Sequence, residues 1–277
     1  RFRDEDVADR WVTESNRWIE ANQDPPFFLF FASQDIHVPR IAHERFQGKS
    51  ELGPRGDCIL QLDWCVGELT KTIERLGLSK NTLFVFCSDN GPVLDDGYKD
   101  DAVEKLGTHE PAGPFRGGKY SVWEGGTRTP FITRWLGKIS PTVSNEVVCT
   151  IDLAASFASL SGQTLPRESC LDSLDVSAAL LGKAGATGRD HLIQQDNGSA
   201  NYGLRSGEWK LVRLKQRGKS QATVSLKEQA MPKGLHSLYR LTDDPGEQKD
   251  LSAENPETVQ RLTKMLDKMI NDGRSRQ

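Results

Sequence analysis

Two short, continuously apolar segments constrain the fold of this chain more than any other feature. The first is residues 27–31, which read Phe-Phe-Leu-Phe-Phe, and the second is residues 82–87, which read Thr-Leu-Phe-Val-Phe-Cys. Between them, residues 57–76 place apolar side chains at steps of three and four and are followed by Gly77, the pattern of a helix with a glycine C-cap. Two apolar strands around a helix predict a β-α-β unit, and therefore a mainly parallel sheet whose strands are covered on both faces.

Polar residues follow both predicted strands. Asp35-Ile36-His37 comes after the first strand, and Ser88-Asp89-Asn90-Gly91 comes directly after the second. Ligands of parallel α/β sheets bind beyond the carboxyl ends of the strands. The sequence therefore predicts a functional site at this edge of the sheet.

The rest of residues 1–185 fits the same α/β core domain. Residues 6–21 predict a helix, and residues 129–133 predict a further strand. A third helix is expected over residues 152–160, with Asp152 as its N-cap.

Residues 186–277 have a different texture, which predicts a small C-terminal α+β subdomain. Short β-prone segments alternate with turn residues and predict a small antiparallel sheet, with strands over residues 191–195, 203–205 and 209–213. Asn255-Pro256 then predicts the start of a C-terminal helix.

Composition excludes several classes of protein. The 277 residues carry a net charge of −3, from 36 basic and 39 acidic side chains, so no global field gathers nucleic acid. Residues 215–233 are locally basic, but they favour a solvated loop over a nucleic-acid strip. The longest apolar run, residues 25–32, is too short to span a bilayer, so no membrane insertion is expected. The sequence begins at Arg1 with neither an initiator methionine nor a targeting segment, which predicts that the chain begins inside a longer protein.

The residues after the strands have a definite chemistry. The Asp89 carboxylate and the Asn90 amide are hard oxygen ligands suited to Ca²⁺ or Mg²⁺, and Gly91 permits the sharp turn that would let both face one point. The imidazole of His37 is a side chain that can donate a proton to an anion or a leaving group.

A glycine-rich segment over residues 116–130 adds a cation. Lys119 stands among paired glycines that allow close backbone approach, and it can hold an anionic group. Glu124 and Arg128 are predicted to form an ion pair that braces the loop. The spacing is not that of a nucleotide-binding P-loop.

Taken in order, these motifs resemble those of the arylsulfatase-type, formylglycine-dependent sulfatases. The matching motifs are His37-x-Pro39, Ser88-Asp89-Asn90-Gly91, Gly118-Lys119 and Glu124-Gly125-Gly126-x-Arg128-x-Pro130. Near the C-terminus, Arg205-x-Gly207-x-Trp209-Lys210-Leu211 and Leu238-Tyr239-x-Leu241-x-x-Asp244-Pro245-x-Glu247 resemble the family's terminal domain. Each motif is weak by itself, but the ordered set is specific and covers nearly the whole chain.

The resemblance implies a role for each matching residue. Asp89 and Asn90 would be two protein ligands of a calcium ion, with magnesium less favoured. His37 would contact the sulfate ester and help to protonate the leaving oxygen. Lys119 would bind a sulfate oxygen and stabilise charge in the transition state.

The resemblance also implies an architecture and a setting. The fold would be the alkaline-phosphatase-like sulfatase sandwich, incomplete in this chain. His109 and Arg116 would be substrate contacts, and the polar loop around them suits a sulfated saccharide. A periplasmic, secreted or lysosomal location is expected by the same resemblance.

The nucleophile is the point where the sequence departs from the family pattern. Sulfatases oxidise the Cys or Ser of a Cys/Ser-x-Pro/Ala-x-Arg motif to formylglycine, and no Cys or Ser of this chain completes that motif. The nucleophile and the remaining metal ligands are therefore expected in an N-terminal half that the chain lacks. The 277 residues alone are predicted to be inactive.

Two alternatives stay open at this point. One is a phosphate or phosphonate ester hydrolase of the same superfamily, although five His residues provide few of the ligands that a two-metal site needs. The other is a non-catalytic binding module that keeps the groove without the nucleophile.

Overall fold

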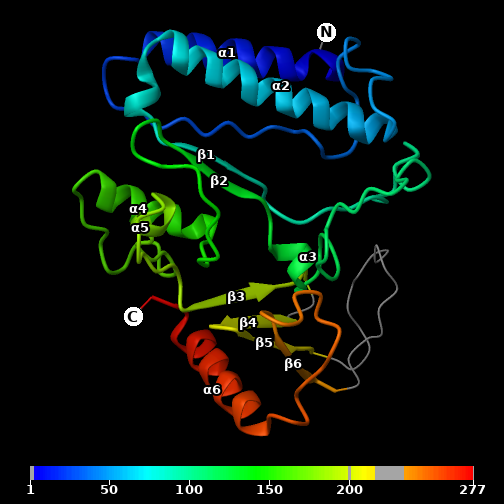
Figure 1. Ribbon diagram of the computed structural model, residues 1–277, viewed down its shortest axis with the longest axis vertical. Coiled ribbons are helices and arrows are strands. Elements are labelled where there is room, and N and C mark those ends of the chain that lie inside the picture. The colour runs from blue at the N-terminus through cyan, green and yellow to red at the C-terminus, as the bar shows by residue number, and fades with distance from the viewer. Residues whose placement is uncertain (1–2, 199–200, 216–233, 277) are drawn as a thin grey trace. The chain divides into compact units, whose positions relative to one another are not determined.

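The computed structural model describes residues 3–198, 201–215 and 234–276, which form two compact units (Figure 1). The first unit consists of Arg1–Leu83 and Val93–Glu110, and the second of Phe84–Pro92 and Pro111–Gln277. The solvated loop predicted for residues 215–233 lies, beyond Lys215, outside the described residues. None of the helices in the described ranges has the length and apolar character to cross a membrane.

The first unit is built on two long helices that pack side by side (Figure 1). The helical elements are η1 (Asp4–Asp6), α1 (Val7–Ala21), α2 (Gly53–Arg75) and η2 (Leu78–Asn81). Ala8 and Val12 of α1 meet the fully buried Cys65 of α2. Both helices were predicted, and Gly77 ends α2 in the left-handed conformation at φ +71°, as expected of a C-cap.

The apolar segment 27–31 differs from its prediction. It is extended, but it belongs to no ladder among the described strands. Its side chains alternate: Phe27, Leu29 and Phe31 are half-buried, whereas Phe28 and Phe30 are 71% and 77% exposed. The expectation of a strand covered on both faces was therefore wrong. Successive side chains of an extended chain point to opposite sides, and only the side of Phe31 packs on the helix pair.

The direction of strand pairing is a second correction. β1 (Phe84–Cys87) pairs antiparallel with β2 (Phe131–Arg134), with Phe84 opposite Arg134 and Cys87 opposite Phe131. All ladders among the described residues are antiparallel, so the mainly parallel sheet was wrong for this part of the chain. The parallel expectation depended on residues 27–31 as the partner of β1, and that pairing does not form here. The α/β class itself is confirmed.

Short helices follow β2 in the second unit. They are η3 (Thr150–Asp152), α4 (Leu153–Leu160) and α5 (Ser177–Leu180). Asp152 stands at the predicted N-cap of α4, but its carboxylate does not cap that helix. It accepts hydrogen bonds from the backbone N–H groups of Cys149 (3.0 Å) and Leu174 (2.9 Å) and pairs with the buried Arg189.

The predicted C-terminal sheet with its helix is confirmed. Four antiparallel strands lie in sequence order: β3 (His191–Gln195), β4 (Tyr202–Ser206), β5 (Trp209–Arg213) and β6 (His236–Arg240). α6 (Pro256–Asp272) packs its apolar stripe on one face, where Leu262 and Leu266 meet Leu204, Leu211 and Leu238 at 0% exposure. The boundary near residue 185 stays a prediction, because the second compact unit extends across it.

The sheet–helix core yields a stability prediction. Leu262→Ala removes a fully buried side chain, so we expect the free energy of unfolding to fall by about 2–5 kcal/mol. Ile270→Ala on the same helix is the matched control, because Ile270 is 40% exposed and its truncation should cost far less. Urea unfolding of both variants measures the difference, and equal losses would contradict this description of the core.

Candidate functional site

The turn that follows β1 and the Lys119 loop are joined backbone to backbone within the second unit. Gly91 N–H donates to the Gly126 carbonyl (2.9 Å), and Lys119 N–H donates to the Pro92 carbonyl (2.9 Å). Gly125 N–H donates to the Arg116 carbonyl (2.7 Å), which closes the loop on itself. These bonds fix Asp89 and Asn90 relative to the backbone of Lys119.

Four glycines make this close approach possible, and we call Gly91, Gly118, Gly125 and Gly126 the glycine junction. A Cβ on Gly91 would lie 1.8 Å from the Gly125 carbonyl oxygen, and one on Gly118 would lie 2.4 Å from that of Pro92. A Cβ on Gly126 would lie 2.4 Å from the Gly118 carbonyl oxygen. All three distances are far below van der Waals contact, and the atoms met are backbone, so a larger residue would push the two loops apart.

Asp89 and Asn90 present two oxygen ligands at the end of β1. Asn90 N–H donates to Asp89 Oδ1 (2.9 Å), and the Asn90 side-chain amide donates to the Gly91 carbonyl (3.0 Å). The second bond engages the amide nitrogen, so Oδ1 is the Asn90 side-chain atom that suits a cation. A carboxylate beside an amide oxygen fits calcium, but calcium takes six to eight oxygens. In the described ranges no group of three or more His, Cys, Asp or Glu side chains could hold a metal ion. The pair therefore fits part of a calcium site.

The Lys119 side chain is half-buried on the same junction. Its ammonium lies 5.1 Å from the centroid of the Tyr120 ring. The backbone N–H is fixed by Pro92, so the loop, rather than a helix or strand, positions this cation.

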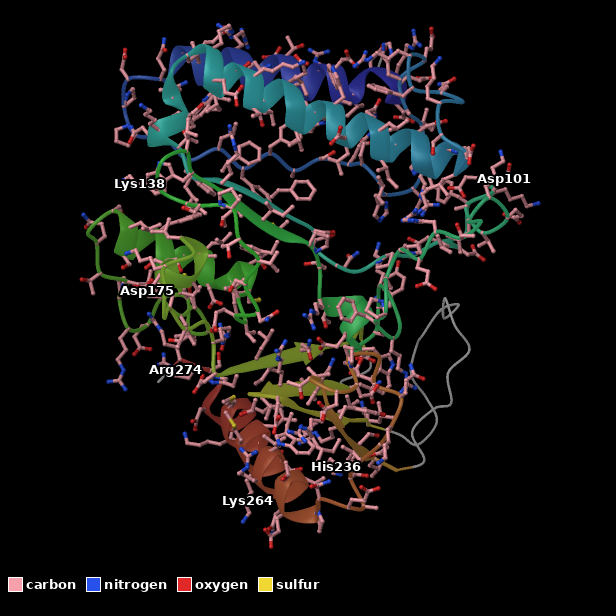
Figure 2. The ribbon with its side chains drawn as sticks, viewed as in Figure 1. Asp101, Lys138, Asp175, His236, Lys264 and Arg274 are labelled. Carbon is pink, nitrogen blue, oxygen red and sulfur yellow. The ribbon has the colours of Figure 1, made fainter. Side chains whose placement is uncertain are left out.

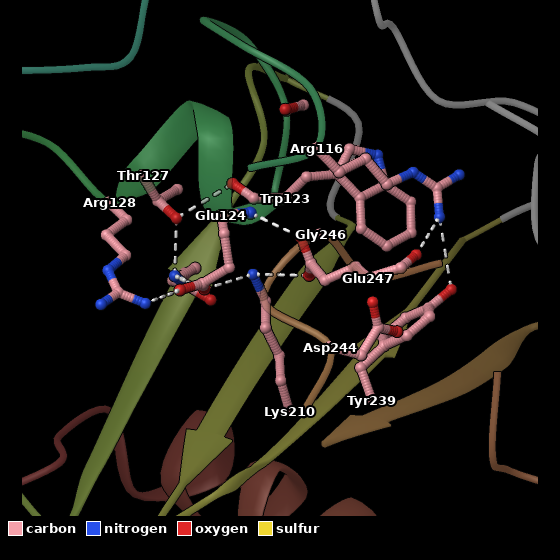
Figure 3. Close-up of polar contacts among 12 residues, drawn as sticks. Arg116, Trp123, Glu124, Thr127, Arg128, Lys210, Tyr239, Asp244, Gly246 and Glu247 are labelled. Atoms are coloured by element: carbon pink, nitrogen blue, oxygen red, sulfur yellow. Dashed lines mark hydrogen bonds and ion pairs between the residues drawn. The ribbon is translucent and has the colours of Figure 1, made fainter. Parts of the chain in front are cut away.

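A buried charge cluster surrounds Glu124, the residue that directly precedes Gly125 of the junction (Figure 3). α3 (Glu124–Thr127) begins with Glu124, whose Oε1 accepts a hydrogen bond from Lys210 Nζ of β5 (2.8 Å). Lys210 Nζ also lies 3.0 Å from Glu247 Oε1, and Glu247 Oε2 accepts the backbone N–H of Glu124 (2.7 Å). All three side chains are 0–1% exposed. Lys210 thus ties the Lys119 loop to the C-terminal sheet.

The three charges shift one another's pKa values. Burial disfavours the charged form of each, but the Lys210 ammonium outweighs burial at Glu124 and lowers the pKa of that carboxyl. At Lys210, burial lowers the pKa, but the charges of Glu247 and Glu124 outweigh burial and raise it. At Glu247 burial dominates over Lys210, and the pKa of this carboxyl is raised. The two carboxyl groups on either side of Lys210 therefore favour its charged form despite its burial.

This cluster modifies the prediction of a Glu124–Arg128 brace. Arg128 Nη1 lies 3.8 Å from Glu124 Oε2 and is 43% exposed, so it is an outer and weaker partner. The principal partner, Lys210, comes from a strand some 86 residues further along the chain. The sequence contained it only as part of the Trp209-Lys210-Leu211 motif.

Arg116 lies in the same buried region. Its Nη1 donates to the Glu247 carbonyl (3.0 Å), and its guanidinium stacks 3.8 Å from the centroid of the Trp123 ring. The residue is 5% exposed. These contacts make Arg116 part of the core. Its predicted contact with substrate stays a prediction, and its burial does not favour that contact.

His37 belongs to the first unit and is exposed. Its Nδ1 lies 2.7 Å from the Val38 carbonyl oxygen, so this nitrogen serves as the donor in that contact. Arg40 holds the loop: its Nε donates to the Ile36 carbonyl (3.3 Å), and its Nη1 pairs with Asp100 (2.7 Å).

Gln61 of α2 also holds the loop that contains His37. Its fully buried amide donates to both oxygens of Asp35 (3.1 and 3.2 Å) and accepts the backbone N–H of His43 (2.8 Å). Burial raises the pKa of Asp35, and the bonds from Gln61 oppose that shift. One helical side chain therefore fixes the chain on both sides of His37.

His109 is also in the first unit, on the loop of residues 93–110. It is exposed, and burial together with the Arg55 charge lowers its pKa. Asp101, labelled in Figure 2, pairs with Lys105 (3.1 Å) on the same loop. The structure thus brings together Asp89, Asn90 and Lys119 in one unit, whereas the convergence of His37 and His109 on them stays a prediction.

Comparison with known proteins identifies the family. The sulfatase family model matches residues 3–163, more than half of the chain, and the chain therefore belongs to the sulfatase family. It is 42% identical over 267 residues to an N-acetylgalactosamine-6-O-sulfatase of Bacteroides thetaiotaomicron, a match that covers 96% of this chain and 51% of the relative. It is 32% identical over 256 residues to human arylsulfatase A, covering 88% of this chain and 48% of that enzyme. The chain spans about half the length of these curated relatives.

Solved structures agree on the fold. A structure from work on glycosaminoglycan metabolism by Bacteroides thetaiotaomicron superposes with a TM-score of 0.89 at 40% identity, over 97% of this chain and 55% of that one. The phosphonate monoester hydrolase of Agrobacterium radiobacter superposes with a TM-score of 0.60 at 14% identity, over 94% of this chain and 60% of its own, which shows a shared fold alone. The predicted alkaline-phosphatase-like sulfatase architecture is confirmed.

The glycine junction predicts the effect of one methyl group. Gly91→Ala places a carbon 1.8 Å from a backbone oxygen, so we expect the junction to open and the free energy of unfolding to fall by about 1–3 kcal/mol. Gly67→Ala on α2 is the control, because nothing lies within 4 Å of its Cβ position and alanine favours a helix. Thermal unfolding compares them; a Gly91→Ala protein as stable as Gly67→Ala would refute the close approach.

The buried lysine predicts a large, pH-dependent loss. Lys210→Met removes the lysine cation between two buried carboxyl groups. We therefore expect the free energy of unfolding at pH 7 to fall by about 3–5 kcal/mol. The lowered pKa of Glu124 means that its contribution in the wild type is present above the ordinary carboxyl pKa and is lost in acid. The penalty should therefore shrink as pH falls, because the variant's carboxyls can take up protons.

Denaturant midpoints measured between pH 4 and 8 check this expectation. Lys249→Met is the matched control, since Lys249 is 71% exposed and should show a small effect without pH dependence. A penalty for Lys210→Met that stays constant over this range would argue against a charge origin.

Proposed function

We propose that this chain is the rear part of a sulfuric ester hydrolase that acts on sulfated saccharides. The observation that carries the proposal is the glycine junction, which fixes two calcium-type oxygen ligands against a lysine in a chain of the sulfatase family. A calcium ion and the Lys119 ammonium would together suit a site that must hold and stabilise a negative group.

Each residue has a role in this proposal. Lys119 binds a sulfate oxygen and stabilises the charge that develops there. His37 donates a proton from Nε2 to the leaving oxygen, with its ring held by the Nδ1 contact to the Val38 carbonyl. His109 contacts the substrate from its exposed loop, and Arg116 braces the base of the junction.

Calcium and formylglycine are the cofactors of the proposal. Asp89 and Asn90 would be two ligands of the calcium ion, which would supply Lewis-acid polarisation of the sulfate group. The nucleophile and the other ligands come from sequence outside these 277 residues, since no Cys/Ser-x-Pro/Ala-x-Arg motif occurs within them. The partner of this chain is therefore the front half of a sulfatase, and the 277 residues alone release no sulfate.

Several lines of support favour sulfated sugars. The N-acetylgalactosamine-6-O-sulfatase relative carries a sugar sulfate in its name and matches nearly the whole chain at 42% identity. The phosphonate hydrolase resembles this chain in fold alone, at 14% identity, so phosphate or phosphonate ester hydrolysis is the weaker candidate. A periplasmic, secreted or lysosomal location accords with this assignment.

Sulfate release tests the proposal directly. The 277-residue chain is compared with a fusion that places the front half of the Bacteroides thetaiotaomicron relative before Arg1. We expect the fusion to hydrolyse a sulfated N-acetylgalactosamine in the presence of calcium and the chain alone to be inactive. The Lys119→Ala fusion is the matched control and should lose about 100-fold or more, as expected when a group that stabilises transition-state charge is removed.

Two outcomes would contradict the proposal. Equal sulfate release by the chain alone and by the fusion would show that the nucleophile lies within the 277 residues. A folded fusion that cleaves phosphonate esters and leaves every sulfate ester intact would favour the related hydrolase.

A further inference from the structure

Glu247 holds both ends of the loop of residues 116–124, which carries Lys119 (Figure 3). At the end of this loop, Glu247 Oε2 accepts the backbone N–H of Glu124 at 2.7 Å. At its start, the Glu247 backbone carbonyl accepts a hydrogen bond from Arg116 Nη1 at 3.0 Å. A single residue from the segment after β6 therefore fixes where the loop begins and where it ends.

The turn that carries Glu247 is itself held in place. Glu247 N–H donates to the Asp244 carbonyl (3.1 Å), and the Asp244 carboxylate accepts the backbone N–H of Gln248 (2.8 Å). Gly246 lies close to Pro114, because a Cβ on Gly246 would be 2.9 Å from the Pro114 carbonyl oxygen. The turn thus lies against the segment that leads into the loop.

The backbone of Glu247 has an unusual conformation. Its φ is +53°, in the left-handed region that glycine adopts readily and that a residue with a Cβ rarely adopts. Tyr120, the residue after Lys119, has the same kind of conformation at φ +76°. Non-glycine residues keep such conformations only where the surrounding contacts enforce them. The contacts of the Glu247 carboxylate, which glycine would lack, offset the strain in its backbone.

Pairing with Lys210 explains only one of the two carboxylate oxygens of Glu247. Oε1 lies 3.0 Å from Lys210 Nζ, and Lys210 also donates to Glu124 Oε1 at 2.8 Å. Burial raises the pKa of Glu247, because a second carboxylate is costly to enclose. Its other oxygen, Oε2, contacts the backbone where the loop ends. That contact is the one that a counter-ion role for Glu247 leaves unexplained.

We propose that Glu247 is the positioning residue of Lys119: it fixes both ends of the loop and so fixes where the Lys119 ammonium meets a sulfate oxygen. Glu247 acts through the backbone of the loop rather than on the substrate. The inference rests on the sulfatase function proposed above, and it adds to the site a residue that lies 123 positions beyond Glu124 in the chain.

Amide hydrogen exchange in the 277-residue chain tests the positioning directly. Glu247→Gly removes the carboxylate, suits the left-handed backbone, and keeps the carbonyl that Arg116 contacts. The amides of Lys119 and Gly125 donate to the Pro92 and Arg116 carbonyls. We expect both amides to exchange about tenfold or more faster than in the wild type, because the loop opens locally. Amides of β4 and β5 report the opening of the whole unit.

Two matched variants separate positioning from stability. Cys170→Gly places a glycine at another left-handed position of the same unit, with φ +49°, and should leave exchange in the loop unchanged. Leu262→Ala weakens the core between α6 and the sheet, so it should speed exchange in β4 and β5 with no preference for the loop.

Glu247→Gln decides the question in the same way should Glu247→Gly fail to fold. It keeps the volume of the side chain but has one acceptor oxygen, which cannot serve both the Lys210 ammonium and the Glu124 N–H. We expect a smaller acceleration at the same two amides.

The catalytic consequence is measured in the fusion with the front half of the Bacteroides thetaiotaomicron relative. For Glu247→Gly we expect kcat to fall about tenfold or more, because a misplaced ammonium stabilises the transition state poorly. KM should change by less than about threefold. The Leu262→Ala fusion should keep the wild-type kcat at a temperature where it is folded, since a purely structural role does not alter turnover per folded molecule.

Wild-type exchange at Lys119 and Gly125 in Glu247→Gly would overturn the proposal. So would equal acceleration in the loop and in the sheet, because it would show only a loss of overall stability. An unchanged kcat in an active fusion would overturn it as well. A fusion that releases no sulfate would contradict the proposed function instead, and the exchange measurement, which needs no activity, would still decide the role of Glu247.

Discussion

The ion pair between Lys210 and Glu124 is the interaction on which the candidate site most depends. A lysine ammonium without exposure to water is stable only beside carboxylates, and Glu124 and Glu247 supply them at 2.8 and 3.0 Å. Glu124 opens the short helix after the Lys119 loop, and Lys210 lies in the middle of the C-terminal sheet. The sheet therefore serves the site by anchoring the loop, although it supplies none of the proposed catalytic groups.

The glycine junction transmits this anchoring to the reactive groups. Gly125 and Gly126 follow Glu124 directly, and their backbones meet those of Gly91 and Gly118 at distances that exclude any side chain. Backbone hydrogen bonds hold the turn of Asp89 and Asn90 against the Lys119 loop.

Particular elements show how far sequence reasoning reaches. The helices were predicted well because apolar spacing and a glycine cap are local signals, as at residues 57–76. The segment 27–31 was misjudged because its composition cannot tell whether one face or two will be covered. The antiparallel β1–β2 pairing was missed for a related reason, since the direction of a ladder depends on which strand arrives as partner. The burial of Lys210 was also missed, because a lone basic residue carries no signal of burial.

The sequence by itself determined the class of this protein. Ordered short motifs identify a sulfatase, predict which residues bind its metal and its sulfate group, and show that no nucleophile motif lies within the 277 residues. Only the tertiary structure decided which charges are buried and what they contact, such as Lys210 beside Glu124 and Glu247, and Arg116 stacked on Trp123. The physical reason is that motif chemistry is carried by neighbouring residues, whereas desolvation and charge pairing depend on groups brought together from distant parts of the chain.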